Sequence, residues 1–377
     1  TASDPGAATA AFCDHDDVRE VLARGETRSS VVVSGGLGVD LRIVDESEYG
    51  AALVYFTGSK AHNVSLRNRA RDRGWKLNEY GLFDVRGVER EGRRVGDRLA
   101  GETEAAVYDA LGLAPIPPEL REDTGEVDAA AADALPDLVA YGAVRGDLQV
   151  HTDASDGSAS LREMAAAADE RGLEYVLVTD HGPNAPVPSR LDADSFERQR
   201  RAVAALADDD DLDVTVLQGV EADITADGID LPDGWAEACD LVVGALHARP
   251  DDATERVVAA LESGSMDVLA HPTNRLLGRR EAVEMDLDAV MAAAGAAGVA
   301  VEINAQPSRL DLDWASVKEY RETVSFVVST DAHAVGEFDT LDLGVAQARR
   351  GWCEAADVVN TRDLDGLRAA LDGLPAR

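Results

Sequence analysis

The feature that most constrains the fold is a regular alternation of short apolar runs and helical segments, which begins at Arg145. Each run is followed by a polar turn and then by a stretch with Ala and Leu at helical spacing. The runs predict strands at 147–151, 174–179, 214–221, 240–246, 266–270, 298–303 and 325–330. The stretches between and after them predict helices at 160–171, 194–207, 252–263, 286–296, 312–321 and 362–372. Strands and helices that alternate in this way form a parallel sheet, either open or closed into a barrel.

Residues 1–113 differ, because short apolar runs there alternate with Gly-rich turns. The runs at 31–36 and 39–44 predict an antiparallel hairpin with helices beside it, and the acidic stretch 14–16 precedes a predicted helix at 17–24. A proline-rich and then alanine-rich segment follows, which is typical of a linker. The predicted organisation is a small α+β region at 1–113, a linker at 114–144 and a large α/β domain at 145–377.

The chain of 377 residues carries 72 acidic residues against 36 Lys and Arg, a net charge of −36, and only three of its residues are lysine. An apolar fraction of 45% is nevertheless enough for a core. Acidic, lysine-poor surfaces are typical of proteins that work in molar salt, so we expect an extreme halophile as the source. Negative charge normally disfavours nucleic acid, but molar salt screens the repulsion, so DNA is not excluded as a substrate.

The three cysteines, Cys13, Cys239 and Cys353, lie far apart in the sequence. Their number and spacing exclude a disulfide scaffold and a thiolate zinc site, and they fit a reducing cytoplasm. No signal peptide is visible, and the longest apolar run, 291–301, is shorter than the ~18 residues that would suggest a membrane span. We therefore expect a cytoplasmic protein with no membrane partner.

Histidine and carboxylate side chains occur where the predicted strands end, and five of the seven histidines are among them. The carboxyl ends of parallel strands converge on one face, and imidazole with carboxylate is a ligand set for Zn, Mn or Fe. One such histidine is more often a packed side chain, and Asp156 alone would be a turn or helix-cap residue. Together they predict a multinuclear metal site. The candidate ligands are His151, Asp156, His181, Glu221, His247, His271, Asp331 and His333.

An arginine-bearing loop follows His271 and contains Arg275, Arg279 and Arg280. Clustered metal ions suit the hydrolysis of phosphate esters, because they activate water and bind the anionic phosphate oxygens. Arginines beside such ions, in a chain this acidic, predict phosphate contacts. The alternative is local charge balance against nearby glutamates.

The motifs at 146–152, 271–280, 302–304 and 309–312, in this order, resemble the PHP (polymerase and histidinol phosphatase) superfamily. They most resemble the PHP domain of bacterial and archaeal family X DNA polymerases. The resemblance covers residues 145–377 and implies a distorted (β/α)7 barrel with up to three divalent ions, Mn²⁺ or Zn²⁺ with Fe²⁺ as a further candidate, on its C-terminal rim.

The resemblance also implies which residues hold each ion. Glu221 and Asp331 are implied to be catalytic, and Glu221 to bridge two ions. Many PHP proteins have histidine where this chain has Gln149, whose neutral amide is a weaker ligand. The implied sets are His151, Glu221 and Asp331 for one ion, Glu221, His247 and His271 for a second, and Asp156, His181 and His333 for a third.

Residues 1–113 resemble the late palm and nucleotide-gripping subdomain of the same polymerases, through motifs at 25–28, 39–42, 55–59, 63–67 and 77–80. By this resemblance Asp40 is the third catalytic aspartate, acting with Mg²⁺ or Mn²⁺, although the residue alone would be an exposed hairpin position. The first two aspartates would precede Thr1, so we expect a fragment without template-directed polymerase activity. The implied nucleotide-binding residues are Tyr55, Phe56, Gly58, Asn63 and Arg67.

The resemblance predicts a metal-dependent 3′–5′ exonuclease or 3′-end processing activity of a DNA repair polymerase. Its partners would be DNA 3′ ends and gapped duplex, with dNTP where the polymerase is complete, and no obligate protein partner is inferred. One alternative is a small-molecule phosphatase of the histidinol-phosphatase type. Another is a PHP domain without activity that only braces the polymerase.

Overall fold

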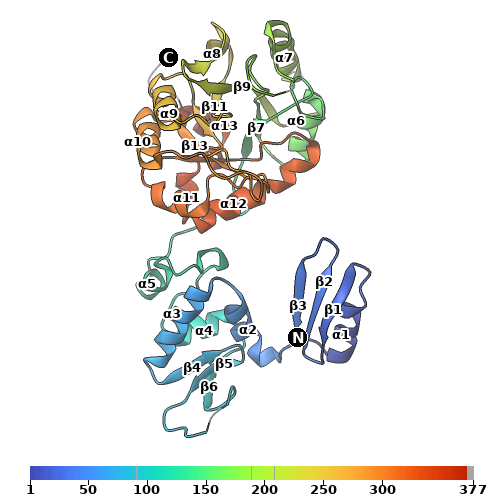
Figure 1. The fold of residues 1–377 in the computed structure, drawn as a ribbon, viewed down its shortest axis with the longest axis vertical. Helices are drawn as coiled ribbons and strands as arrows, with labels where there is room; N and C mark the ends of the chain where they lie inside the picture. Colours follow the sequence, from blue (N-terminus) through green and yellow to red (C-terminus); the bar gives the residue numbers. More distant parts are fainter. Residues whose placement is uncertain (91, 188, 208, 372–377) are drawn as a thin grey trace. The chain divides into compact units, whose positions relative to one another are not determined.

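The computed structural model describes residues 1–90, 92–187, 189–207 and 209–371 (Figure 1). The chain divides into two compact units, Thr1–Leu135 and Pro136–Arg377, which are described separately. The division falls within the segment 114–144.

The first unit begins with helix α1 (Pro5–Cys13) and an antiparallel sheet of β1 (Val18–Arg24), β2 (Arg28–Val33) and β3 (Gly38–Arg42). The predicted hairpin is therefore present as β2 and β3. The predicted helix at 17–24 is wrong, because these residues form β1. Its apolar residues Val18, Val21 and Leu22 have the i, i+3, i+4 spacing of a helix, but the segment pairs with β2, with two irregularities in the register.

The rest of the first unit is a second α+β group with its own three-stranded antiparallel sheet, β4-β5-β6. Its buried core includes Leu66, Leu82, Val107, Tyr108 and Leu111. The elements are η1 (Glu46–Glu48), α2 (Tyr49–Phe56), α3 (Lys60–Arg71), β4 (Trp75–Asn78), β5 (Gly81–Asp84), β6 (Asp97–Ala100), α4 (Glu104–Ala110), η2 (Pro118–Leu120) and α5 (Glu126–Ala131).

The second unit is a nearly closed barrel of parallel strands in the order β14-β13-β12-β11-β9-β8-β7. The first and last strands meet at a parallel bridge between Val150 and Ala332, next to a hydrogen bond from His151 N to Ala332 O (2.8 Å). All seven predicted strands are confirmed, and a short β10 (Gly228–Asp230) extends β9 as an antiparallel hairpin. The strands are β7 (Gly146–Val150), β8 (Tyr175–Val178), β9 (Thr215–Thr225), β11 (Leu241–Ala245), β12 (Val268–Ala270), β13 (Ala300–Asn304) and β14 (Phe326–Ser329).

Helices lie around the strands of this barrel (Figure 1). The six predicted helices are present, and α8 (Trp235–Ala238) and α12 (Leu341–Arg350) were not predicted. Gly344 interrupts the apolar pattern of α12, yet the packing requires it. A Cβ there would lie 2.5 Å from Val328 Cγ1 and 2.9 Å from Ala305 Cβ. The other helices are α6 (Leu161–Glu170), α7 (Ala193–Leu206), α9 (Ala253–Glu262), α10 (Leu287–Ala297), α11 (Trp314–Tyr320) and α13 (Leu364–Leu371), with 3-10 turns η3 (Val335–Thr340), η4 (Ala355–Asp357) and η5 (Val359–Thr361).

The barrel strands are buried on both faces, which explains their continuous apolar composition. Residues that point into the barrel pack together, and Leu367 of α13 joins them. Strand residues alternate between the faces. Glu221 lies four residues after the inward Leu217, and Glu302 two residues after the inward Ala300. Both carboxylates therefore point into the C-terminal mouth of the barrel.

Among the described residues, no helix combines the length and apolar character needed to cross a bilayer.

The melting temperature of the chain should rise with KCl, because a net charge of −36 opposes compaction until salt screens it. A gain of ~2 kcal/mol would correspond to ~4–8 °C for a domain of about this size. The measurement is calorimetry from 0.1 to 2 M KCl. Because the screening length falls to ~3 Å at 1 M, the rise should level off near that concentration. A melting temperature that stays constant between 0.1 and 1 M would contradict this reasoning.

Candidate metal centre

The parallel strands bring the predicted ligands to the C-terminal mouth of the barrel. His151 directly follows β7, and His271 directly follows β12. Glu221 lies within β9, which continues four residues beyond it. The remaining ligands lie in loops that follow β7, β8, β11 and β14, and they are Asp156, His181, His247, Asp331 and His333.

Glu221 lies at the centre of the cluster, and four histidines face its carboxylate. Its Oε2 is 3.4 Å from His151 Nε2 and 3.0 Å from His181 Nδ1. Its Oε1 is 3.4 Å from His247 Nε2 and 3.1 Å from His271 Nε2. The side chain of Glu221 is only 1% exposed. One buried carboxylate is therefore shared by imidazoles from four different strand ends.

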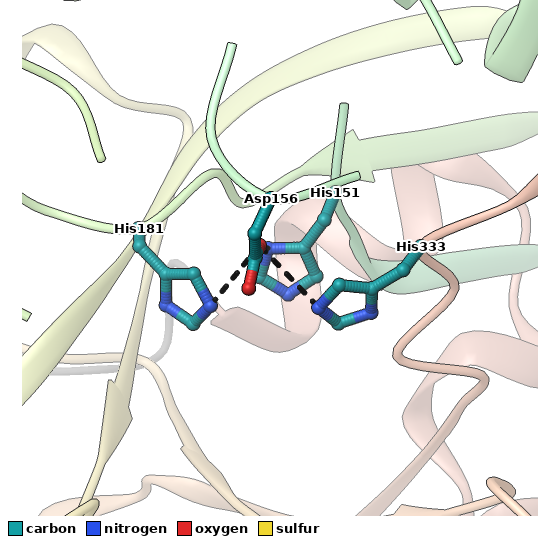
Figure 2. A group of neighbouring side chains, drawn as sticks. All are labelled: His151, Asp156, His181 and His333. Carbon is teal, nitrogen blue, oxygen red and sulfur yellow. Dashed lines mark ion pairs between the residues drawn. The ribbon is translucent and has the colours of Figure 1, made fainter. Parts of the chain in front are cut away.

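Asp156 joins a second group on one side of Glu221. Figure 2 shows its carboxylate between the rings of His181 and His333, with His151 alongside. Asp156 Oδ1 is 3.4 Å from His181 Nε2, 3.5 Å from His333 Nε2 and 4.0 Å from His151 Nδ1. His181 thus faces Asp156 with one ring nitrogen and Glu221 with the other.

Asp331 closes the cluster at the end of β14. Its Oδ1 is 3.2 Å from His151 Nε2, and its Oδ2 accepts a hydrogen bond from Asn304 Nδ2 (3.1 Å). Arg309 Nε lies 3.4 Å from the same Oδ2. Each of the three sets implied by the family resemblance is therefore brought together, and His151 and His181 also connect neighbouring sets.

The chemistry of these side chains fits divalent cations. Four buried ring nitrogens, both of His151 and the Nδ1 atoms of His181 and His271, make no hydrogen bond of good geometry among the described residues, although His151 Nε2 and His181 Nδ1 lie close to carboxylates. Buried polar atoms normally have partners, so these nitrogens need another one. In two groups, ligand atoms all lie within 4.8 Å of one another: His151, Asp156, His181 and His333, and His181, Glu221 and His247.

Carboxylates control the protonation of the histidines in the metal-free protein. Burial alone would lower the pKa of His181, but the carboxylates of Glu221 and Asp156 outweigh it and raise the pKa to about 11. The same opposition raises the pKa of His247 and of His333 to about 9. Burial lowers the pKa of His271 to about 4. Three of these imidazoles therefore hold protons at pH 7 that a metal ion would have to displace.

Metal binding should release protons and strengthen as the pH rises from 6 to 9. A ligating histidine must be neutral, and the raised pKa values mean that protons compete with the metal throughout this range. The measurement is calorimetric titration with Mn²⁺ in buffers of different ionisation enthalpy. His15→Ala, which removes an exposed histidine of the first unit, should leave the proton count unchanged. A binding enthalpy independent of the buffer would contradict the prediction.

Asp223, which the sequence analysis did not single out, orients His247. Asp223 Oδ1 accepts hydrogen bonds from the His247 ring at Nδ1 (3.0 Å) and from its backbone N (3.2 Å). This contact directs His247 Nε2 toward Glu221. His333 is held in the same way, because its Nδ1 contacts the Asp331 carbonyl oxygen at 2.8 Å. Asp223 lies two residues after Glu221, so both side chains are on the same face of β9 only because the strand continues to Thr225. The sequence predicted that this strand ends at residue 221, so it gave no sign that Asp223 orients His247.

Asp223→Ala should weaken metal binding at the His247 side about 10–100-fold, the usual contribution of a partner that orients a ligand. The measurement is Mn²⁺ titration with the bound metal counted per chain. Asp227→Ala, on the exposed turn of the same hairpin, should have no effect. Equal metal affinity in the Asp223 variant and the native chain would contradict this role.

The loop that carries Asp156 is held in place by hydrogen bonds to the buried side chain of Asp180. The buried Asp180 carboxylate accepts hydrogen bonds from Thr152 N (2.8 Å) and Thr152 Oγ1 (2.6 Å), and also from Ser155 Oγ and Gln199 Nε2. The Asp156 loop is thus connected to α7.

The arginine-bearing loop uses part of its charge internally. Arg275 donates to the carbonyl oxygens of Arg309 (3.0 Å) and Leu310, and Arg280 Nε donates to Asn274 O (2.9 Å). Arg279 is exposed. Arg309 is the arginine placed directly at the cluster, although the sequence analysis did not list it as a site residue.

Gln149 is buried beneath the cluster. With its amide nitrogen facing Glu302, it donates to Oε1 (2.6 Å) and Oε2 (3.3 Å). Burial, together with the nearby Asp331 and Glu221 carboxylates, raises the pKa of Glu302 well above its usual value.

The residues implied to bind nucleotide lie in the first unit. Tyr55 and Phe56 end α2, Gly58 has a positive φ of 82° in the turn that follows, and Asn63 and Arg67 lie on α3. Asp40 lies on β3, where Ser30 Oγ donates to its carboxylate. In the part of the chain that the structure describes, no hydrogen bond or ion pair joins Asp40 to the other five.

Comparison with known proteins agrees with the division of the chain into two units, Thr1–Leu135 and Pro136–Arg377. Residues 52–122 match the DNA polymerase beta thumb family, and residues 147–361 match the PHP domain family. The chain is 36% identical over 363 residues to the DNA polymerase/3′-5′ exonuclease PolX of Bacillus subtilis. This match covers 94% of the chain and 62% of the relative, so the chain spans about three fifths of that protein.

Two phosphatases are also similar to parts of the chain. A protein of Shewanella sediminis named "Probable phosphatase" is 32% identical over 169 residues, which are 42% of this chain and 63% of that protein. The crystal structure of histidinol phosphate phosphatase from Lactococcus lactis matches with a TM-score of 0.41 and 15% identity, over 55% of this chain and 94% of that one. Because the PHP match covers more than half of the sequence, the chain belongs to the PHP domain family and is a homologue of the family X polymerase PolX.

Proposed function

We propose that the chain is a metal-dependent 3′–5′ exonuclease that processes DNA 3′ ends, associated with a DNA-directed polymerase. The observation that carries the proposal is the buried Glu221 carboxylate, which four histidine nitrogens approach to between 3.0 and 3.4 Å. The similarity to PolX, whose name includes this exonuclease activity, supports DNA as the substrate.

Up to three divalent ions would be held by the three ligand sets, with Glu221 between two of them. Mn²⁺ or Zn²⁺ suits these imidazole and carboxylate ligands, and Fe²⁺ is a further candidate. When bound, such ions activate water and stabilise the negative charge on phosphate oxygens. Glu221 and Asp331 would keep the imidazoles oriented, and Gln149 would contribute at most a weak contact.

Arginines beside the cluster would bind the phosphates of the DNA strand. Burial and the neighbouring guanidinium groups of Arg309 and Arg249 lower the pKa of Arg280, which reflects concentrated positive charge in an otherwise acidic chain. Arg309 adjoins Asp331, and the exposed Arg279 has, among the described residues, none of the internal hydrogen bonds that hold Arg275. We therefore propose Arg309 and Arg280 for the phosphate at the metal centre and Arg279 for the strand beyond it.

The first unit would grip DNA and nucleotide in the complete polymerase. Tyr55, Phe56, Gly58, Asn63 and Arg67 would line the nucleotide site, and Asp40 would be one of its catalytic carboxylates with Mg²⁺ or Mn²⁺. Gapped duplex DNA and dNTP would then be the ligands, in the cytoplasm and without an obligate protein partner.

The test is digestion of a 5′-labelled single strand and of a gapped duplex in molar KCl with Mn²⁺. We expect the products to shorten one nucleotide at a time from the 3′ end, and a phosphorothioate at the terminal linkage to slow the reaction. The similarity to proteins named as phosphatases favours a small-molecule phosphatase as the second candidate. Hydrolysis of histidinol phosphate without shortening of DNA would support that alternative and contradict the exonuclease.

A further inference from the structure

Glu302 is a buried carboxylate that belongs to none of the predicted metal sets. It lies on β13 between its ligand-bearing neighbours β12 and β14, and it is 0% exposed. Within the described part of the chain, no basic side chain forms an ion pair with Glu302. In contrast, the carboxylates of Glu221, Asp156 and Asp331 all face imidazole nitrogens.

The hydrogen bonds of Glu302 reach the end of β12, the end of its own strand β13, and β7. Its Oε2 accepts from the backbone N of His271 (2.7 Å) and from Asn304 Nδ2 (3.2 Å). Its Oε1 accepts from the amide of Gln149 (2.6 Å). The same Asn304 Nδ2 donates to Asp331 Oδ2 (3.1 Å), so the contact continues from Glu302 to a metal-binding carboxylate.

The backbone at both connected ligands is unusual. His271 has a φ of 27° and Asp331 a φ of 53°, although neither residue is glycine. Non-glycine residues with positive φ persist where the surroundings hold them, and they occur often at functional sites. The contact from Glu302 to the His271 amide, and the contact through Asn304 to Asp331, are restraints of this kind.

We propose that Glu302 is a positioning residue that fixes His271 and Asp331 in the orientation that binds metal. The inference rests on the proposed metal-dependent function. It adds the residue that would orient one ligand in each of two metal sets, the set with His271 and the set with Asp331. Glu302 acts from beneath the ions through Asn304 and a backbone amide. In this role Gln149 is the partner that holds the other oxygen of Glu302.

The test compares Glu302→Gln with the native chain by Mn²⁺ titration, without substrate. Glutamine keeps the volume, but its amide nitrogen replaces one of the two acceptor oxygens, so it opposes either the Gln149 amide or the donors of Asn304 and His271. We expect metal affinity to fall about 10–100-fold. The metal-free melting temperature should fall no further than that of Asp267→Asn, because each variant replaces one acceptor oxygen of a buried carboxylate by a donor.

A matched control is Asp267→Asn. Asp267 is another buried carboxylate that holds a strand amide, that of Val242 (2.7 Å), but it precedes β12 at the opposite end of the barrel. This control should bind Mn²⁺ like the native chain. An equal loss of affinity in both variants would overturn the proposal, because any buried carboxylate would then have the same effect.

Two further measurements separate positioning from a general structural role. Excess Mn²⁺ should restore the turnover of Glu302→Gln, while KM for DNA stays unchanged. The combined loss in Glu302→Gln with Asn304→Ala should be smaller than the product of the two single losses, because both act on Asp331. Native metal affinity in Glu302→Gln overturns this inference alone. A native chain that binds no Mn²⁺ overturns the proposed function as well.

Discussion

Glu221→Gln is expected to lose two bound ions and to reduce the proposed exonuclease activity about 100-fold to 1,000-fold or more. Losing even a group that orients a metal ligand typically costs about 10–100-fold in metal affinity or activity, and Glu221 would itself be a ligand of two ions, with four imidazoles facing its carboxylate. The fold should survive, because the pKa of His181 and of His247 would fall without Glu221 and these rings would become neutral. The measurements are metal content by mass spectrometry and the rate of 3′-end release.

The matched control is Glu284→Gln, which changes an exposed glutamate in the segment after the arginine-bearing loop. It should keep the native metal content and rate. If Glu221→Gln retained all its metal, Glu221 would not be a bridge, and the strand-end histidines would have to be explained as packed side chains.

Removal of metal is expected to lower the melting temperature of the second unit by ~8–16 °C. A ligand at 1,000 times its dissociation constant stabilises the native state by ~4 kcal/mol, and each kcal/mol shifts a domain of 150–250 residues by ~2–4 °C. The measurement is calorimetry of the full chain in molar KCl, with Mn²⁺ or with EDTA. In the described part of the first unit no group of ligand atoms suits a metal, so its transition should not move. A second-unit transition that is unaffected by EDTA would contradict the metal centre.

The barrel could be predicted from the sequence because its strands are buried on both faces. Such strands appear as short apolar runs, and each run is separated from the next by a helical segment. The helix α12 escaped prediction because Gly344, which its close approach to Val328 requires, interrupts the apolar pattern. The strand β1 was mistaken for a helix because Val18, Val21 and Leu22 have helical spacing, and two irregularities in its pairing with β2 accompany the lack of strand alternation.

The candidate ligands could be predicted because parallel strands end on one face, so that residues far apart in sequence meet there. Their partners could not be predicted in the same way. Asp223 reaches His247 only because β9 continues beyond Glu221. Glu302 contacts a backbone amide and an asparagine, and contacts of this kind produce no recognisable pattern of residue types in the sequence. The roles of Arg275 and Arg309 depend on the path of a loop, which spacing does not determine.

Anomalous diffraction from crystals grown with Mn²⁺ in molar KCl tests the central claim most directly. Three peaks are expected at the C-terminal mouth of the barrel. Two should flank the Glu221 carboxylate, and the third should lie between Asp156, His181 and His333. The absence of any peak beside Glu221, with Mn²⁺ present in the crystal, would contradict the account.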